Sequence, residues 1–398
     1  TQASDFDFEL YGVNDKGLLL PDGTRFKEGG LQFDLVARTE LPGGWEGKLD
    51  YRYLSSYLFR QSFTQSFNEA ILSEVNSIGF LQRHWQDYTV NIGFERQQLF
   101  ESITPGDLIS IQKLPSVDFI AKDRDISQGP IPIWVSLDSN ISLLRRQQQT
   151  FQTSNFVDRE NLEPHLTTAF SFKGLSLIPN FTVHATHWGD SLTVPGLVNT
   201  ASIFRSAADA TVELVPPSIE RIFPAPKWMG KKIKHVIEPR VKYRYVGGVD
   251  NFNKIIRFDE TELLSDTNQL KLSIVNRFYL KNKQGQVMEL FNWEVAQERY
   301  FDPTFGGALI PGQANIFSVT EDLTPFTFIT RPRHYSPINS VLRLNPNGHL
   351  TIDWRVDYDP FYRRFTNNTI SADYRFKKNY FIAAGYRELN QDPLIQPY

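Results

Sequence analysis

Apolar side chains occupy every second position over runs of roughly ten residues, and such runs recur along the chain. In residues 45–53, for example, Leu49 and Tyr51 alternate with charged neighbours, and residues 87–95 and 349–358 follow the same rule. A period of two produces a β-strand with one apolar and one polar face. Strands of about 9–11 residues with this alternation are typical of transmembrane β-barrels. The pattern therefore predicts an all-β chain that forms a large antiparallel transmembrane β-barrel.

Composition agrees with a barrel and excludes several other classes of protein. The 398 residues carry a formal net charge of −3, which gives no electrostatic argument for a nucleic-acid partner. Aromatic residues make up 14% of the chain, and a barrel can place them in girdles at the two membrane interfaces. The sequence has no cysteine, so disulfides and thiolate metal sites are excluded. No segment has the roughly 18 consecutive apolar residues of a helical membrane span.

Alternating segments bounded by turn residues predict about eighteen strands. They are residues 4–11, 30–39, 45–54, 75–85, 87–97, 115–122, 132–144, 165–173, 177–187, 204–214, 233–246, 268–280, 286–299, 316–330, 337–345, 349–358, 368–376 and 380–388. Pro115 and Pro325 argue against a central position for two of these segments, because proline cannot donate a ladder hydrogen bond. No shift in composition marks a boundary, so we expect residues 1–398 to form one outer-membrane β-barrel domain.

Short and long connections mostly alternate between the predicted strands. The short ones include residues 40–44, 282–285 and 346–348, which contain glycine at turn positions. The long ones are residues 55–74, 98–114, 145–164, 188–203 and 247–267. Outer-membrane barrels are built in this way, with tight periplasmic turns and longer outer loops. Residues 123–131 and 216–232 break the pattern, and the second segment resembles an inserted loop.

A soluble β-sandwich or β-propeller is the alternative fold. Propeller blades usually repeat every 40–50 residues or so with recurring motifs, and the sequence shows no such repeat. A sandwich of this length would divide into modules joined by linkers, which are also not visible. The alternation and the order of the connections therefore favour the membrane barrel.

The sequence contains no motif for catalysis or for a cofactor. No nucleophile elbow, His-Glu-x-x-His segment or phosphate-binding loop is present. His184 and His187 suggest a metal pair, but an offset of three places two strand residues on opposite faces unless a bulge intervenes. We therefore expect no enzyme, no catalytic residue, no cofactor and no metal site. Linear sequence leaves open a barrel hydrolase whose Ser/His or Asp/His groups come from different strands.

Charged residues alternate along residues 234–246 and predict a polar interior surface there. Glu238, Arg240 and Lys242 fall on one face of the predicted strand. Such residues either line a water-filled lumen or contact an amphipathic cargo or a plug protein. Pro239 lies inside the same strand, where we expect a local kink or bulge.

The same stretch resembles the LPS-assembly protein family LptD, also called OstA or Imp. In that family a barrel strand has an apolar-Glu-Pro-Arg core followed by alternating aromatic residues, as in residues 234–246 here. Residues 264–278 look like the next strand of the family, with Asp-x-Asn-Gln-Leu and x-Arg-Phe elements. Residues 49–56 and 298–301 are similar to further family strands. The candidate lumen or motif residues are Glu238, Pro239, Arg240, Lys242, Asp266, Asn268, Gln269 and Arg277.

This resemblance implies an outer-membrane translocon that assembles lipopolysaccharide into the outer leaflet. Sugars would pass through a polar lumen while the lipid leaves laterally between the first and last strands. An LptE-like lipoprotein would plug the barrel, and an LptA-like periplasmic bridge would deliver lipid to an N-terminal jellyroll. By family proportions, we expect this chain to be the barrel region, without the jellyroll and incomplete at both ends. The alternative function is a porin or a substrate-specific outer-membrane channel.

Overall fold

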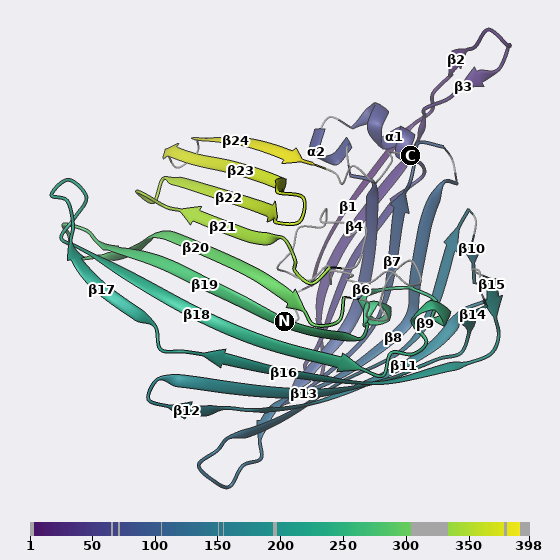
Figure 1. The fold of residues 1–398 in the computed structure, drawn as a ribbon. Coiled ribbons are helices and arrows are strands. Elements are labelled where there is room, and N and C mark those ends of the chain that lie inside the picture. Colours follow the sequence, from purple (N-terminus) through teal and green to yellow (C-terminus); the bar gives the residue numbers. More distant parts are fainter. Residues whose placement is uncertain are drawn as a thin grey trace.

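The computed structural model describes residues 4–64, 67–70, 72–104, 106–149, 151–153, 155–193, 197–303, 333–377 and 380–390. Most of them belong to a single large antiparallel β-sheet that curves around an interior (Figure 1). No helix in this part of the chain is long and apolar enough to cross a membrane.

The long strands follow one another in the sheet in the order of the chain, each paired antiparallel with the next. They are β1 (Ser4–Val13), β4 (Gly30–Leu41), β5 (Trp45–Leu54), β6 (Glu74–Trp85), β7 (Tyr88–Phe100), β8 (Leu108–Asp125), β9 (Ile133–Gln148), β11 (Val157–Thr168), β13 (Leu175–Trp188), β16 (Ile203–Val215), β18 (Lys232–Gly247), β19 (Thr267–Lys281), β20 (Val287–Tyr300), β21 (Ile338–Leu344), β22 (Leu350–Asp359), β23 (Arg364–Lys377) and β24 (Tyr380–Leu389). Among the described residues no pairing register joins β1 to β24, so the sheet is not closed there.

Short elements lie in the connections. They are β2 (Leu18–Leu19), β3 (Arg25–Phe26), α1 (Tyr57–Phe63), α2 (Phe67–Ala70), β10 (Phe151–Gln152), β12 (Phe170–Phe172), β14 (Ser191–Thr193), β15 (Leu197–Asn199), β17 (Ile219–Pro224) and the 3-10 helices η1 (Phe252–Lys254) and η2 (Glu260–Leu263). The long connections lie at one end of the strands and most short turns at the other, because antiparallel strands reverse direction at each connection. The predicted alternation of short and long connections is thus confirmed in part, because the connections predicted at residues 98–114 and 145–164 span only residues 101–107 and 149–156.

The two faces of the sheet differ as the alternation predicts. On β18, Lys234, Glu238 and Arg244 share the face on which the β18–β19 connection packs, and we call this the concave face. The opposite, outer face carries apolar side chains such as Leu272 and Ile274 of β19, which are 52% and 49% exposed. Exposed aliphatic side chains over a continuous outer face suit contact with acyl chains and not with water.

The predicted strand positions are confirmed along nearly the whole chain, except that two strands begin earlier than predicted and one predicted segment is not described. Residues 316–330 lie outside the described residues. The predicted starts at residues 115 and 165 are wrong, because β8 already begins at Leu108 and β11 at Val157. Strand β11 continues through Pro164, which pairs with Leu137 of β9. Polar residues and Pro164 hid the alternation in this strand.

Two prolines behave differently from the sequence expectation. Pro115 does lie within a paired strand, β8, and the register with β9 shifts between Lys113 and Ser116. This irregularity lets a residue without an N–H group fit inside the ladder. The bulge expected at Pro239 is absent, because the β18–β19 register runs unshifted and pairs Pro239 with Ile274. On its other side β18 pairs with β17 up to residue 237 and with β16 from residue 241, so Pro239 falls in the gap between these two ladders.

The segment predicted as an inserted loop at residues 216–232 contains a strand that sequence reasoning missed. Strand β17 pairs with β18 from Ile219 opposite Ile237 to Pro224 opposite Lys232. Strand β17 therefore continues the line of β16 along the N-terminal half of β18 (Figure 1). Its alternation is only a few residues long and lies between prolines, which explains why the pattern was not recognised.

A positive charge introduced on the outer face by substitution tests which face of the sheet meets lipid. Leu272→Arg places a guanidinium against lipid and is expected to lower the free energy of unfolding in a bilayer by roughly 2–4 kcal/mol. Denaturant titration of the chain reconstituted in lipid vesicles measures this change. Glu294→Arg on β20 is the matched control, because Glu294 lies on the concave face. The free energy of unfolding of the control variant should fall by less than about 1 kcal/mol. Equal decreases for both variants would contradict the assignment of the outer and concave faces.

Candidate functional site on the concave face

The predicted lumen residues of β18 and β19 lie on the concave face as expected. Glu238, Arg240 and Lys242 alternate along β18, and Gln269 and Arg277 occupy the same face of β19 through the ladder. The Arg277 Nε lies 3.4 Å from the Glu238 carboxylate, so the structure brings these two predicted residues together. The candidate site therefore includes a row of polar and charged side chains on the concave face of β18 and β19.

The other predicted residues have structural positions away from this row. Pro239 and Asn268 lie on the outer face, where the Tyr243 hydroxyl donates a hydrogen bond to Asn268 Oδ1 at 3.0 Å. Asp266 precedes β19, and its Oδ1 accepts a hydrogen bond from the Val249 backbone at 2.9 Å. Asp266 and Asn268 of the Asp-x-Asn-Gln-Leu element thus lie at the base of the β18–β19 connection, while Gln269 of the same element lies on the concave face.

Opposite charges face each other across the strands of the concave wall. Arg244 of β18 pairs with Asp209 of β16 at 2.6 Å, and Arg240 lies 3.6 Å from Glu213. These side chains are partly exposed, and ion pairs of this kind contribute only about 0–1 kcal/mol each. Their main effect is to keep the wall charged and hydrated.

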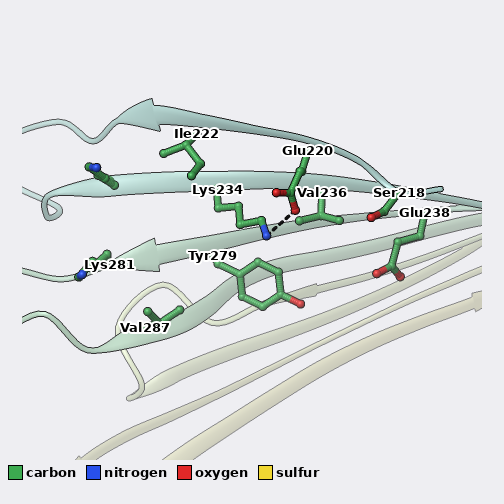
Figure 2. A pocket seen from close by; sticks show the side chains of 10 residues that line it. Ser218, Glu220, Ile222, Lys234, Val236, Glu238, Tyr279, Lys281 and Val287 are labelled. Carbon is green, nitrogen blue, oxygen red and sulfur yellow. Dashed lines mark ion pairs between the residues drawn. The ribbon is translucent and has the colours of Figure 1, made fainter. Parts of the chain in front are cut away.

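A depression of about 660 Å³ lies at the short-turn end of this wall. Figure 2 shows that Glu220 of β17 and Lys234 of β18 form an ion pair across it, with Tyr279 of β19 beside them. Glu238 lines the same depression farther along β18 (Figure 2). The missed strand β17 therefore contributes directly to the polar wall.

The connection between β18 and β19, residues 248–266, packs against the concave face. We call it the inward loop. Its apolar residues Ile255, Ile256 and Phe258 are buried in one cluster with Leu144 of β9 and Trp188 of β13. In Figure 1 the two short helices of this loop lie beside β8 and β9, within the curve of the sheet. Burial of three apolar side chains at roughly 1.5–3 kcal/mol each holds the loop against the wall.

A buried network of charges fixes the same loop. Arg159 of β11, only 3% exposed, donates from Nη1 to Asp259 at 2.9 Å and to Glu262 at 2.8 Å. The Lys113 ammonium lies 3.0 Å from Asp259, and the Trp188 indole N–H donates to Glu262 Oε1 at 3.0 Å. Buried charges are tolerated only when they are paired and hydrogen-bonded in this way.

The two loop carboxylates respond to this environment in opposite directions. Burial and the neighbouring Asp259 charge raise the pKa of Glu262, which is 1% exposed. Burial acts to raise the pKa of Asp259 as well, but the positive charges of Arg159 and Lys113 outweigh it and lower that pKa. Asp259 is therefore the carboxylate whose ionisation stabilises the packed inward loop at neutral pH.

Sequence reasoning predicted a long loop at residues 247–267 but missed its inward packing. One local signal was available, because Asp259 and Glu262 form a capping box at the start of η2. The cluster Ile255-Ile256-x-Phe258 is also unusually apolar for an exposed outer loop. Neither signal identifies Lys113 and Arg159 as partners, which lie a hundred or more residues earlier.

The two histidines considered as a metal pair lie on opposite faces of β13, as the offset of three predicts. His184 is on the concave face, with Nδ1 3.1 Å from Glu163 and Nε2 3.8 Å from Asp209. His187 is on the outer face, 2.7 Å from Glu160. Among the described residues, Asp158, Glu160 and His187 place possible metal-ligand atoms within 4.8 Å of one another. All three are substantially exposed, and the His187–Glu160 hydrogen bond accounts for their proximity.

Removal of the Asp259 charge tests whether the network holds the inward loop. Asp259→Asn leaves Arg159 and Lys113 undercompensated, which costs about 3 kcal/mol or more for a buried pair. Amide hydrogen exchange in residues 248–266 should therefore accelerate roughly 100-fold or more. Asp353→Asn is the control, because its ion pair with Arg343 is exposed and contributes little.

The pH dependence of amide hydrogen exchange in the inward loop is a second test of the role of Asp259. Since the folded-state pKa of Asp259 is lowered, its contribution is fully present above its ordinary pKa of 3.8 and is lost as pH falls below that value. Exchange in the inward loop, corrected for intrinsic rates, should stay slow from pH 7 to near that value. Loss of protection already between pH 7 and 5 would contradict the assignment of ionised Asp259 as the carboxylate that stabilises the inward loop.

Comparison with known proteins agrees with the fold and with the family that the sequence resembles. The family model described as LPS transport system D matches residues 30–397, which is nearly the entire chain. No curated protein sequence matches the chain. The family is a transport family and not an enzyme family. The large antiparallel sheet, the polar concave face and this match together place the chain in the LPS transport system D (LptD) family of outer-membrane β-barrel proteins, which transport lipopolysaccharide.

Proposed function

We propose that the chain is the barrel of a translocon that assembles lipopolysaccharide into the outer leaflet. The sugar portion of the lipopolysaccharide passes along the concave face, which forms the lumen wall. The lipid portion leaves laterally into the bilayer. The single observation behind this path is the contrast between the two faces of β18 and β19. Arg240 and Lys242 stand on a charged inner wall, while Leu272 and Ile274 stand on an exposed apolar outer face.

The physical chemistry of the cargo favours separate routes for its two portions. Sugars exchange hydrogen bonds with water for hydrogen bonds with side chains such as Glu238, Arg240 and Lys242 at little net cost. Acyl chains in a hydrated lumen would lose about 0.8 kcal/mol of transfer free energy per CH₂, or roughly 10 kcal/mol for a chain of a dozen carbons. The lipid portion therefore stays in apolar surroundings while the sugars follow the polar wall.

The predicted site residues have two roles in this proposal. Glu238, Arg240, Lys242, Gln269 and Arg277 line the polar path. The remaining motif residues Pro239, Asp266 and Asn268 support the strand and the base of the inward loop.

The proposed partners follow from membership of the family. An LptE-like lipoprotein occupies the lumen as a plug, and an LptA-like bridge delivers lipopolysaccharide from the periplasm. The wide charged wall with the depression beside β17 offers such a plug polar groups to contact. We also propose that the described sheet belongs to one barrel domain that spans residues 1–398.

Site-specific photo-crosslinking tests the lumen path. A benzophenone amino acid at position 240 or 242 should capture lipopolysaccharide in cells, because both positions lie on the polar path. Position 241 on the outer face of the same strand is the matched control and should capture bulk lipid instead. Crosslinks to lipopolysaccharide that occur only in the outer loops would contradict the proposal.

A porin or substrate-specific channel is the second candidate, favoured by the exposed charges of the concave face. An open channel predicts steady ion conductance when the purified chain alone is inserted into planar bilayers. A plugged translocon predicts little conductance for the chain with its lipoprotein, and a large increase when the lipoprotein is removed. High conductance that does not change with the plug would favour the channel.

A further inference from the structure

The sheet has an extension at its short-turn end, formed by β17 and the adjoining ends of β18, β19 and β20 (Figure 1). Among the described residues β17 pairs with β18 alone. The neighbouring strand β13 begins only at Leu175, and Pro217, just before β17, lies close to Gly174 in the turn that precedes β13. Strand β17 therefore continues past that turn with one edge unpaired. An unpaired edge is not tolerated in hydrocarbon, so the extension lies at or beyond the lipid headgroups.

A row of aromatic side chains crosses the outer face of the strands where this extension begins. The Phe278 ring of β19 stacks on the His235 ring of β18, with 4.1 Å between the ring centroids. Phe278 also contacts the Phe291 ring of β20 edge to face at 5.2 Å, and Phe291 contacts the Trp293 ring at 6.5 Å. Rows of aromatic side chains on the outside of a barrel mark the level of a membrane interface. The interface at the short-turn end therefore lies near His235 and Phe278.

Basic residues gather beyond this row, on the two neighbouring hairpins. Residues 221–237 contain five Lys or Arg residues and no Asp or Glu. Residues 277–288 contain three Lys or Arg residues and again no Asp or Glu. We call these two segments the basic extension. The chain as a whole carries a formal net charge of −3, so positive charge is concentrated here against the overall balance. The basic residues are Arg221, Lys227, Lys231, Lys232, Lys234, Arg277, Lys281 and Lys283.

The backbone joins the two hairpins of the basic extension. The Lys231 N–H donates to the Lys281 backbone oxygen at 2.7 Å, and Lys232 is the ladder partner of Lys281. In the described part of the chain, the one ion pair of these lysines joins Lys234 to Glu220. Lys232 and Lys281 lie three residues beyond the aromatic row, which is roughly 7–8 Å of depth on a tilted strand. One headgroup layer is roughly 5–8 Å thick, so the lysines lie at the depth of the headgroups.

The tip between β17 and β18 presents an exposed tryptophan among these lysines. The Trp228 side chain is 79% exposed. Hydrogen bonds from the Met229 and Gly230 N–H groups to the Pro226 backbone oxygen, at 2.9 and 3.2 Å, fix the turn that carries it. Tryptophan beside lysine is characteristic of segments in the interface of anionic membranes. An acidic protein partner would explain the lysines, but the depth of the tip and the exposed indole favour a lipid surface.

We propose that the basic extension binds the headgroups of anionic phospholipids in the periplasmic leaflet of the outer membrane. The short turns of outer-membrane barrels face the periplasm, and the chain belongs to a family of such barrels. Lys227, Lys231 and Lys283 contact the phosphate groups, and the Trp228 indole lies among the headgroups. A lysine close to an anionic surface contributes about a fivefold preference for that surface. This contact fixes the depth of the barrel beside β17 and is separate from the proposed lumen path.

Photo-crosslinking from the hairpin tip tests the proposal on the full chain reconstituted in vesicles. A benzophenone amino acid replaces Trp228, and the vesicles contain equal parts of phosphatidylcholine and phosphatidylglycerol. Mass spectrometry of the crosslinked chain should show about a fivefold or larger excess of phosphatidylglycerol. Lys227→Gln combined with Lys231→Gln should bring the ratio to within about twofold of parity, because two positive charges leave the tip. Neither side chain forms a hydrogen bond or an ion pair within the described residues, so the double variant should fold normally.

A matched control separates the tip from the charge of the chain as a whole. Lys16→Gln combined with Lys27→Gln removes the same charge from exposed positions in the β1–β4 connection, at the long-loop end, and should leave the ratio unchanged. In cells, the probe at position 228 should capture phospholipid. Equal capture of the two lipids by the wild-type tip, or an equal effect of the two double variants, would overturn the proposal. Capture of a periplasmic protein in place of phospholipid in cells would also overturn it, because the lysines would then serve a protein partner.

Discussion

The pairing of backbone groups within the bilayer is the constraint on which the rest of this structure depends. An unpaired N–H or C=O in hydrocarbon costs several kcal/mol, so each strand must form ladders with neighbours on both sides. Once strands are paired in this way, successive side chains must point to opposite faces of the sheet. A chain that alternates apolar and charged residues then acquires a lipid-facing and a water-facing surface at the same time. The contrast between Leu272 and its neighbour Lys271 follows from this geometry alone.

The inward loop shows a second way of stabilising structure in this chain, since it is held by tertiary packing and not by a ladder. Ile255, Ile256 and Phe258 supply burial, and Asp259 and Glu262 supply charge for Arg159. Apolar burial alone would hold the loop in several similar positions. The hydrogen-bonded charges select one of them, because a buried carboxylate is tolerated only where its partners are in place. The loop is thereby fixed against β9 and β13 on the concave face.

Sequence alone predicted the fold well and the site only in part, for a physical reason. Strand faces follow from a local period of two, so the concave positions of Glu238, Arg240 and Lys242 could be predicted from residues 234–246. The start of β11 was missed because its polar residues and Pro164 break the local pattern. The contact of Arg159 with Asp259 spans a hundred residues and depends on the curvature of the sheet, which no local pattern encodes. The family was recognised correctly, yet Asp266 and Asn268 lie at the base of the inward loop and do not line the interior.

Single-cysteine scanning along β18 tests the central claim most directly. The sequence contains no cysteine, so each introduced thiol is the one reporter in its variant. A spin label at successive positions from 237 to 244, in the reconstituted chain, reports whether it meets water or lipid. The account predicts strict alternation, with labels at 238, 240, 242 and 244 accessible to a water-soluble relaxation agent and labels at 237, 239, 241 and 243 accessible to oxygen in the lipid. Equal access of the water-soluble agent to both sets would contradict the two-faced barrel wall and the transport path along it.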